Sequence, residues 1–414
     1  MPCGKRQRPE LIAPAGDWAC LTTAVAQGAD SVYFGVKGLS LRNFAGNFDS
    51  QELRRVMEYV HARGKRGYLA LNVVVYEREL TKVRAILGQA KKAGVDAVIC
   101  WDLSVVRMAG EQGLQVHLST QASAANSRAL AEYTQLGISR AVLARECTLK
   151  DVISIQKSLL RENIVCELEV FIHGAMCISI SGRCFLSAYS AGKSANRGQC
   201  LQYCRRRFLI REVQDEQEYE LGEDYVLSAR DLCTLDFLDE LLDSGVRACK
   251  IEGRTRPPEY VGAVTSVYRR AIDDWHSGTL TGAKKKRYRQ ELAQTYNRGF
   301  SPGFYFGTPA ADPSDGGAQP YRKQYIGRVE KYYARLGVAE ISVHKGPLRI
   351  GQELLVTGKQ TPAARFSVEQ MQQDHVFVTQ VEAGQRVGVR IPFPVRPQDK
   401  IFEWSMEKKA KETP

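Results

Sequence analysis

Residues 10–36 read ELIAPAGDWACLTTAVAQGADSVYFGV and contain the pattern that decides the fold. An apolar run at 10–15 is followed by a helical pattern, by Gly28, and by a second β-branched run at 31–36. A glycine at the end of a helix supplies the left-handed residue that ends the helix before the next strand. Two buried runs joined by a helix are typical of parallel strands. This segment therefore predicts an α/β fold.

The same unit recurs along the chain. Six further runs have strand character, and most of them follow a helical pattern: 66–72, 97–102, 115–120, 140–145, 167–174 and 248–253. Eight strands with intervening helices predict a (β/α)₈ TIM-like barrel, with functional groups at the C-terminal ends of the strands. A doubly wound open sheet is the alternative, but no GxGxxG follows the first strand, so a dinucleotide-binding version has little support.

A tract rich in Gly, Pro and Asp divides the chain into two domains. We expect a TIM-like barrel domain at 1–298, with an insertion whose cysteine-rich segment is 174–208, and a linker at 299–324. The runs between 325 and 406 are short, alternating and bounded by turns, as in a small all-β barrel. Residues 407–414 are expected to form a tail.

The composition suits a globular protein with a large core. The 414 residues are 44% hydrophobic and 25% charged, and the formal net charge is +12. We find no apolar stretch long enough to cross a membrane and no apolar core of a secretory signal, so we expect a cytoplasmic protein without a membrane partner. The basic balance favours a polyanionic partner such as RNA, because Lys and Arg release counterions from phosphates. A solvated basic surface explains it equally well.

Four of the eleven cysteines crowd one short polar segment. Cys177, Cys184, Cys200 and Cys204 are spaced C-x₆-C-x₁₅-C-x₃-C. Four thiolates hold either a tetrahedral zinc ion or a [4Fe–4S] cluster. Zinc sites usually pair their cysteines two to four residues apart, and only the last two approach that spacing. The spacing therefore favours the cluster. A zinc ion is the alternative metal, and Cys233 is an alternative fourth ligand.

Polar residues at the ends of the predicted strands are candidates for catalysis. Lys250, Glu252 and Arg254 alternate in KIEGR and so share one face of the last strand, as catalytic groups or as an ion-paired rim. His173 precedes Cys177 by four residues and is a candidate proton donor, although a lone histidine at a strand end more often serves packing.

Candidates for substrate binding follow other strands or accompany the cysteines. They are Arg42, Asn72, Gln121, Asn126, Arg145, Arg183 and Arg197. Asn43 shares the loop of Arg42 and is a candidate by position. The neighbouring rings of Phe44 and Phe48 could stack on a base, although core packing is the more usual role of such rings.

The segment EVFIHGAMCISISGRCFLS at 169–187 resembles the signature of the U32 peptidase family. The N-terminal segment at 10–35, LSTQASAANS at 118–127 and KIEGRTRPPEYV at 250–261 resemble family segments too. The resemblance spans nearly the whole chain. It implies hydroxylation without molecular oxygen, because the family includes proteins that form 5-hydroxyuridine in tRNA, a ribosomal RNA cytidine hydroxylase and two ubiquinone-pathway hydroxylation proteins.

The length of the chain and its C-terminal barrel are most similar to the tRNA-modifying members. The resemblance therefore implies a tRNA hydroxylase acting on the wobble uridine, with prephenate as co-substrate and a [4Fe–4S] cluster held by Cys177, Cys184, Cys200 and Cys204. It also allows a homologous partner subunit. The alternatives are hydroxylation of rRNA or a quinone precursor, a non-catalytic RNA-binding iron–sulfur protein, and a collagenase-like protease. The protease lacks support from an HExxH, a GxSxG or a clear Cys/His pair.

Overall fold

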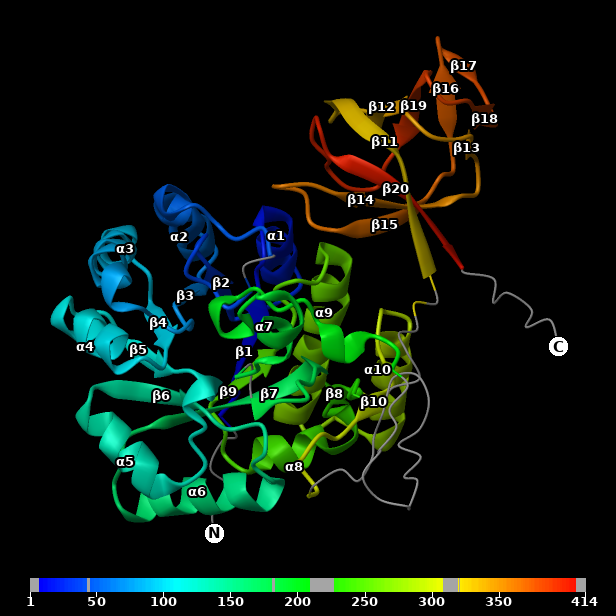
Figure 1. The fold of residues 1–414 in the computed structure, drawn as a ribbon. Coiled ribbons are helices and arrows are strands. Elements are labelled where there is room, and N and C mark those ends of the chain that lie inside the picture. The colour runs from blue at the N-terminus through cyan, green and yellow to red at the C-terminus, as the bar shows by residue number, and fades with distance from the viewer. Residues whose placement is uncertain are drawn as a thin grey trace, which may run out of the picture.

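The computed structural model describes residues 7–42, 45–180, 183–208, 227–307, 319 and 321–406. Eight parallel strands form a closed barrel (Figure 1): β1 (Glu10–Pro14), β2 (Ser31–Gly35), β3 (Arg66–Ala70), β4 (Ala97–Cys100), β5 (Val116–Leu118), β6 (Ile138–Val142), β7 (Glu167–Ala175) and β9 (Ala248–Ile251). Neighbouring strands pair in chain order, and β9 pairs with both β7 and β1, which closes the ring. The eight predicted strands and the TIM-like barrel are confirmed, and the open sheet is wrong.

Helices cover the outside of the barrel (Figure 1). They are α1 (Trp18–Ala26), α2 (Leu53–His61), α3 (Leu80–Ala93), α4 (Leu103–Glu111), α5 (Ser127–Gln135), α6 (Leu149–Arg161), α8 (Leu238–Asp243), α9 (Pro258–His276) and α10 (Gly282–Ala293). The starts and ends follow local chemistry: Asp17 caps α1 by accepting from the Cys20 amide, and Gly94 ends α3 with φ of 77°. Apolar faces of these helices and of the strands make one large core.

Two short strands extend the sheet outside the barrel. The strand β8 (Asp231–Cys233) runs antiparallel to the end of β7, and β10 (Phe300–Ser301) pairs in parallel with β8. In β8, Leu232 pairs with Gly174 and Cys233 with His173. Residues 300–307 pack on the barrel rather than forming a linker from 299, since the Tyr305 hydroxyl donates to the Phe171 carbonyl at 2.8 Å.

Antiparallel strands build the C-terminal domain around a separate apolar core. They are β11 (Tyr321–Tyr333), β12 (Val338–Val343), β13 (Leu348–Arg349), β14 (Glu353–Thr357), β15 (Ala364–Ser367), β16 (Met371–Gln373), β17 (Val376–Phe377), β18 (Gln380–Val381), β19 (Arg386–Arg390) and β20 (Lys400–Met406). Eight of them form one sheet in the order β15-β14-β20-β11-β12-β19-β16-β17. The prediction of a second, all-β domain is confirmed, and its first strand begins at 321. The expected tail at 407–414 lies outside the described residues.

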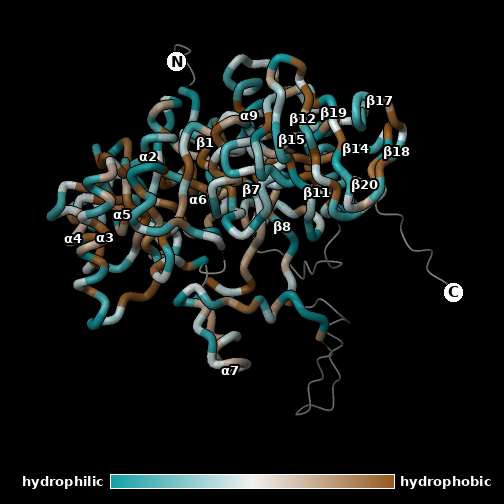
Figure 2. Tube along the Cα trace, turned by 90° about the horizontal axis from the view of Figure 1, so that it is seen from above, coloured by the Kyte–Doolittle hydropathy of each residue, from teal (hydrophilic) through white to brown (hydrophobic). Residues whose placement is uncertain are grey.

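The two domains touch through α1 and α9. Lys323 forms a 2.9 Å ion pair with Glu259, and the Ala363 amide donates to Thr23 Oγ1 at 2.9 Å. Across the part of the chain that the structure describes, no helix combines the length and apolar character that a membrane span requires. The insertion after β7 contains the helix α7 (Leu186–Ala191), which projects away from the barrel when the molecule is seen from above (Figure 2).

Candidate functional site

A cavity of about 450 Å³ opens at the C-terminal ends of the barrel strands. Its walls come from the loops after β2, β3, β5, β6, β7 and β9 and from the insertion after β7. This is the face where TIM barrels place their functional groups. The structure brings most of the predicted site residues together here: Arg42, Asn72, Gln121, Arg145, Cys177, Cys184, Cys200, Cys204, Lys250, Glu252 and Arg254.

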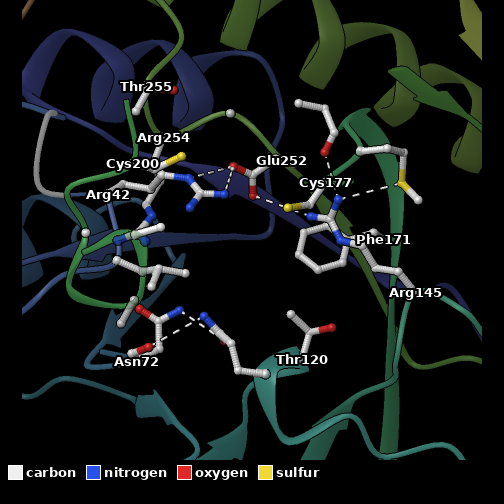
Figure 3. A pocket seen from close by; sticks show the side chains of 18 of the residues that line it. Arg42, Asn72, Thr120, Arg145, Phe171, Cys177, Cys200, Glu252, Arg254 and Thr255 are labelled. Carbon is white, nitrogen blue, oxygen red and sulfur yellow. Dashed lines mark hydrogen bonds and ion pairs between the residues drawn. The ribbon is translucent and has the colours of Figure 1, made fainter. Parts of the chain in front are cut away.

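Glu252 occupies the centre of a group of arginines (Figure 3). Its carboxylate accepts from Arg42 Nη2 at 3.2 Å and lies 3.8 Å from Arg145 Nη2. Burial opposes ionisation of Glu252, but the guanidinium groups of Arg42, Arg145 and Arg254 hold the pKa of its carboxyl below the ordinary value. The cavity therefore contains a fixed carboxylate surrounded by an excess of positive charge.

Arg145 and Arg254 are themselves held in place. Arg145 Nη1 donates to the Ala175 carbonyl at 2.7 Å, and its guanidinium carbon lies 4.0 Å from the centre of the Phe171 ring. Arg254 donates to Ser40 Oγ at 2.6 Å, and burial lowers the pKa of its guanidinium to about 10. Arg145 Nε is buried and has no hydrogen-bond partner among the described residues.

Below the cavity, the barrel interior is ionic rather than purely apolar. Lys250 Nζ lies 2.8 Å from Glu169 Oε1, and Arg140 contacts Glu10 at 2.8 Å and Glu169 at 3.7 Å. All four side chains are buried. Lys250 also lies 4.6 Å from the centre of the Tyr33 ring at the cavity floor. The alternation in KIEGR thus places Glu252 and Arg254 at the mouth of the cavity and Lys250 at its floor, where Lys250 is paired with Glu169.

The insertion after β7 places four cysteines on the cavity wall. Cys177 follows the end of β7, Cys184 precedes α7, Cys200 follows a 3₁₀ turn at Ala195–Arg197, and Cys204 lies in a second turn at Tyr203–Arg205. All four thiols are partly exposed, and none is in a disulfide. Figure 3 shows Cys177 and Cys200 facing the cavity near Glu252.

Local contacts hold this insertion in shape. The Cys184 amide donates to Asn196 Oδ1 at 3.0 Å, and the Leu201 amide donates to Ser187 Oγ at 3.0 Å. Just before the insertion, near the end of β7, Gly174 has φ of 109°, and a Cβ there would lie 2.5 Å from the Glu252 carbonyl oxygen. Only glycine allows this approach, so the first cysteine loop packs directly against the Glu252 loop.

The donor set fits an iron–sulfur cluster. Burial raises the pKa of the Cys204 thiol, and the other three thiols act in the same direction, which reports their proximity. Among the described residues, no three His, Cys, Asp or Glu side chains form a group that could hold a metal ion. The four thiols therefore line one cavity without forming a preformed metal site in this structure, and it is the chemistry of four thiolates that suits a cluster.

Cys233 lies away from this cavity. It is 4% exposed, on β8, and the Tyr268 hydroxyl lies 3.7 Å from its Sγ. Burial raises the pKa of the Cys233 thiol to about 11, which is the behaviour of a structural thiol.

His173 also faces away from the cavity, so its candidacy as a proton donor there is wrong. The pairing of β7 with β9 shifts by one residue between Phe171 and His173, which turns His173 to the same side as Ile251. It packs against α9, with Tyr268 Oη 3.4 Å from Nδ1, and burial lowers the pKa of its imidazole to about 3.

Three other predicted binding residues have different roles. Asn126 is exposed and caps α5 by accepting from the Ala129 amide at 2.9 Å. Arg197 ties the insertion to the β3 loop through an ion pair with Glu79 and a bond to the Val74 carbonyl. Arg183 lies outside the main cavity, with its guanidinium carbon 4.7 Å from the Trp101 ring centre.

Asn43 and Phe44 lie outside the described residues. Sequence reasoning missed Arg256 and Arg298, which line the cavity and contact Asp231 at 3.8 and 3.1 Å. Arg256 continues the alternation of KIEGRTR and could have been found from it, whereas nothing in the sequence around Arg298 indicates the site.

The fold and the site define a TIM-barrel protein with a thiol-rich, cationic cavity at the C-terminal face of the barrel. The chain belongs to peptidase family U32, whose model matches residues 16–315. It is 36% identical to a collagenase from Porphyromonas gingivalis, over 95% of this chain and 97% of that protein.

Other relatives have names from RNA modification. The chain is 32% identical to tRNA hydroxylation protein P1 from Bacillus subtilis, over 80% of this chain and 79% of that protein. It is also 32% identical to the enzyme from Escherichia coli named as a synthase of 5-hydroxycytidine in 23S rRNA, over 64% of this chain and 39% of that protein. Relatives of this chain thus include proteins named for RNA hydroxylation and proteins named as collagenases.

Proposed function

We propose that this protein hydroxylates RNA, forming 5-hydroxyuridine at the wobble position of tRNA in the cytoplasm, without molecular oxygen. The observation that carries the proposal is the arrangement of four thiols and several cations around one cavity at the C-terminal face of the barrel. The names of the Bacillus and Escherichia relatives support RNA hydroxylation as the reaction class. Hydroxylation of rRNA or of a quinone precursor is the alternative within that class.

The cluster ligands in this proposal are Cys177, Cys184, Cys200 and Cys204. Conversion of a C5–H and a water molecule into a C5–OH releases two electrons and two protons, so the reaction needs a two-electron acceptor. A [4Fe–4S] cluster held by these cysteines would relay the electrons to that acceptor one at a time. The cations near the thiols also offset the negative charge of four thiolates. The Glu252 carboxylate raises the pKa of Arg42, and the Cys177 and Cys200 thiols act in the same direction.

The same cations suit a carboxylate-bearing co-substrate, which we propose is prephenate. Arginine binds carboxylates in a bidentate way, and Arg42, Arg145 and Arg254 approach the cavity from three different loops. Glu252 holds two of these guanidinium groups, so it positions them and limits the net positive charge. Lys250 is bound to Glu169 and supports the cavity floor.

Mass analysis of tRNA nucleosides tests the proposal directly. A deletion strain without a paralogue should lose 5-hydroxyuridine derivatives, and the wild-type gene should restore them. A strain expressing Cys184→Ala should stay deficient although the protein accumulates. Unchanged nucleosides in the deletion strain would overturn the assignment to tRNA. A change confined to rRNA or to quinones would move it to the alternative substrate, and a homologous subunit that purifies with the chain would identify a shared enzyme.

Proteolysis is a second candidate because of the collagenase name of the Porphyromonas relative. A thiol protease needs a histidine within hydrogen-bond reach of its nucleophile. Among the residues that the structure describes, no histidine lines the cavity. Collagen cleavage by anaerobically purified protein, abolished by Cys200→Ala, would favour the protease. Retained RNA affinity without any product would favour a non-catalytic iron–sulfur protein.

A further inference from the structure

A second, smaller cavity adjoins the thiol cavity on the side of α7. Its volume is about 270 Å³, below the range of roughly 300–1,000 Å³ that encloses a drug-sized molecule. Leu41, Asn72 and Gln121 line both cavities, so the two share a wall. The remaining lining comes mainly from apolar and aromatic side chains, among them Trp101 from the loop after β4 and Phe185 from the insertion after β7.

We propose that this smaller cavity binds one unstacked pyrimidine base of an RNA strand, next to the thiol site. The inference rests on the proposed RNA substrate and names the subsite that would hold the reacting base or its neighbour. RNA-binding proteins recognise single-stranded bases by stacking them on aromatic rings and guanidinium planes. A cavity of this size has room for one base rather than for a folded segment of a macromolecule.

The aromatic surface is already present. Arg183 lies over the Trp101 ring at 4.7 Å, and the Trp101 indole N–H donates to the Asn72 carbonyl at 3.1 Å, which fixes the ring. Phe185 is 62% exposed and lines the smaller cavity, so its ring is accessible to a ligand. A base entering beside these rings would cover apolar surface, while Arg183 would remain close to the phosphates.

The side-chain amide of Asn72 supplies a polar group to the lining of the smaller cavity. Asn72 is 9% exposed, and its Oδ1 is buried without a hydrogen-bond partner among the described residues. The orientation of its amide is fixed, because Asn72 Nδ2 donates to Gln121 Oε1 at 3.4 Å and Ser119 Oγ donates to the same oxygen. Oδ1 is therefore an acceptor, which matches the N3–H donor of uracil or the exocyclic amine of cytosine.

The base cavity is built from the same loop as the thiol site. Arg183 and Phe185 are the two chain neighbours of Cys184, and Asn196, which also lines the base cavity, accepts from the Cys184 amide at 3.0 Å. A base in this cavity would thus lie beside one of the proposed cluster ligands. This relationship separates the cavity from an incidental surface hollow, since the reacting carbon must come close to the thiol site.

The test measures binding of the full-length protein to two labelled RNA pentamers at one salt concentration. One pentamer has a single central uridine among abasic positions, and the other is abasic throughout, so their difference in affinity isolates the base. Trp101→Ala and Phe185→Ala should reduce the uridine-dependent affinity about 5- to 150-fold, the range for loss of one stacked base. Trp101→Phe should retain most of it, because the ring remains.

Phe377→Ala is the matched control, because Phe377 is 67% exposed on β17 of the other domain. It should leave both affinities within about twofold of wild type, since most surface substitutions are nearly neutral. Equal affinity of wild type for the two pentamers, or equal losses in all variants, would overturn the proposal. So would displacement of the RNA by a proline-rich peptide when the uridine adds nothing, which would indicate a peptide subsite.

The binding result and the nucleoside result fail independently. Uridine-dependent binding that depends on Trp101 and Phe185, combined with unchanged tRNA nucleosides in a deletion strain, would refute tRNA hydroxylation and leave the base subsite standing. Loss of 5-hydroxyuridine in that strain, combined with no uridine-dependent binding, would refute the subsite alone.

Discussion

The ammonium group of Lys250 lies 2.8 Å from the carboxylate of Glu169, and both side chains are buried inside the barrel. The two residues belong to β9 and β7, the strands whose pairing helps to close the ring. Glu169 also lies 3.7 Å from Arg140. These paired charges form the layer of the barrel interior directly below the cavity. The floor of the cavity is therefore built on ion pairs whose partners both lie inside the barrel.

Lys250→Met should destabilise the protein strongly, because Glu169 would lose its closest cation in a buried position. We expect the free energy of unfolding to fall by about 3–5 kcal/mol, the usual cost of breaking a buried ion pair. Urea denaturation followed by circular dichroism measures it. Lys37→Met is the control, since the Lys37–Asp49 pair is exposed, and it should cost less than about 1 kcal/mol. Similar losses in both variants would contradict a structural role for the buried pair.

Cys204→Ala and Cys233→Ala should separate the two candidates for the fourth cluster ligand. Cys204 lines the thiol cavity and Cys233 does not. After anaerobic purification, we expect Cys204→Ala to lose most of the iron and the visible absorption, and Cys233→Ala to keep both. Iron and sulfide quantitation per chain provides the measurement. The opposite pattern would place the fourth ligand on β8, and zinc in place of iron would refute the cluster.

Glu252→Gln should make stability less dependent on acid pH. The folded-state pKa of Glu252 is below its ordinary value of 4.5, so its charge stabilises the folded protein above that pH. This contribution is lost as the pH falls through the folded-state value. We therefore expect wild type to be more stable than the variant near neutral pH and the gap to narrow below 4.5. Denaturation midpoints across this range test it, and a constant gap would contradict the ionised state.

His173 should affect stability rather than the chemistry of the cavity. Burial lowers the pKa of His173 from 6.5 to about 3, so the unfolded chain takes up the proton first as the pH falls. The folded state should lose about 1.4 kcal/mol per pH unit between these values through this group. His173→Asn should remove that slope and leave cluster iron unchanged. An acidic limb of the activity profile that disappears in this variant would instead place His173 in the reaction.

The barrel and its functional face could be predicted because the necessary signals are local. Gly28 and Gly94 mark where helices end, and the β-branched runs that follow them are the strands. The crowding of cysteines near 177–204 is visible in one segment, and the structure places all four on one cavity. The sequence does not define the geometry of a cluster, and the binding of an iron–sulfur cluster by these cysteines stays a prediction.

Other features depend on long-range pairing that a sequence pattern does not encode. Strict alternation places His173 with Phe171, but a one-residue shift in the β7–β9 register turns it outward. Asn126 follows β5 in the chain, yet its side chain is used as a helix cap. Arg298 reaches the cavity only because β10 returns to pair with β8. These residues show that a position after a strand indicates the C-terminal face of the barrel. It does not indicate whether the side chain contacts the cavity.

The absence of a Cβ at Gly174 lets the two halves of the site, the cysteine-bearing insertion and the Glu252 loop, pack against each other. Gly174 lies near the end of β7, just before the cysteine-bearing insertion, and packs against the backbone of Glu252, whose carboxylate contacts Arg42 and Arg145. Any larger residue at this position would push the cysteine-bearing insertion away from the Glu252 loop. One backbone contact therefore sets the distance between the thiols and the arginine cluster, so a substitution that moves one group also moves the other.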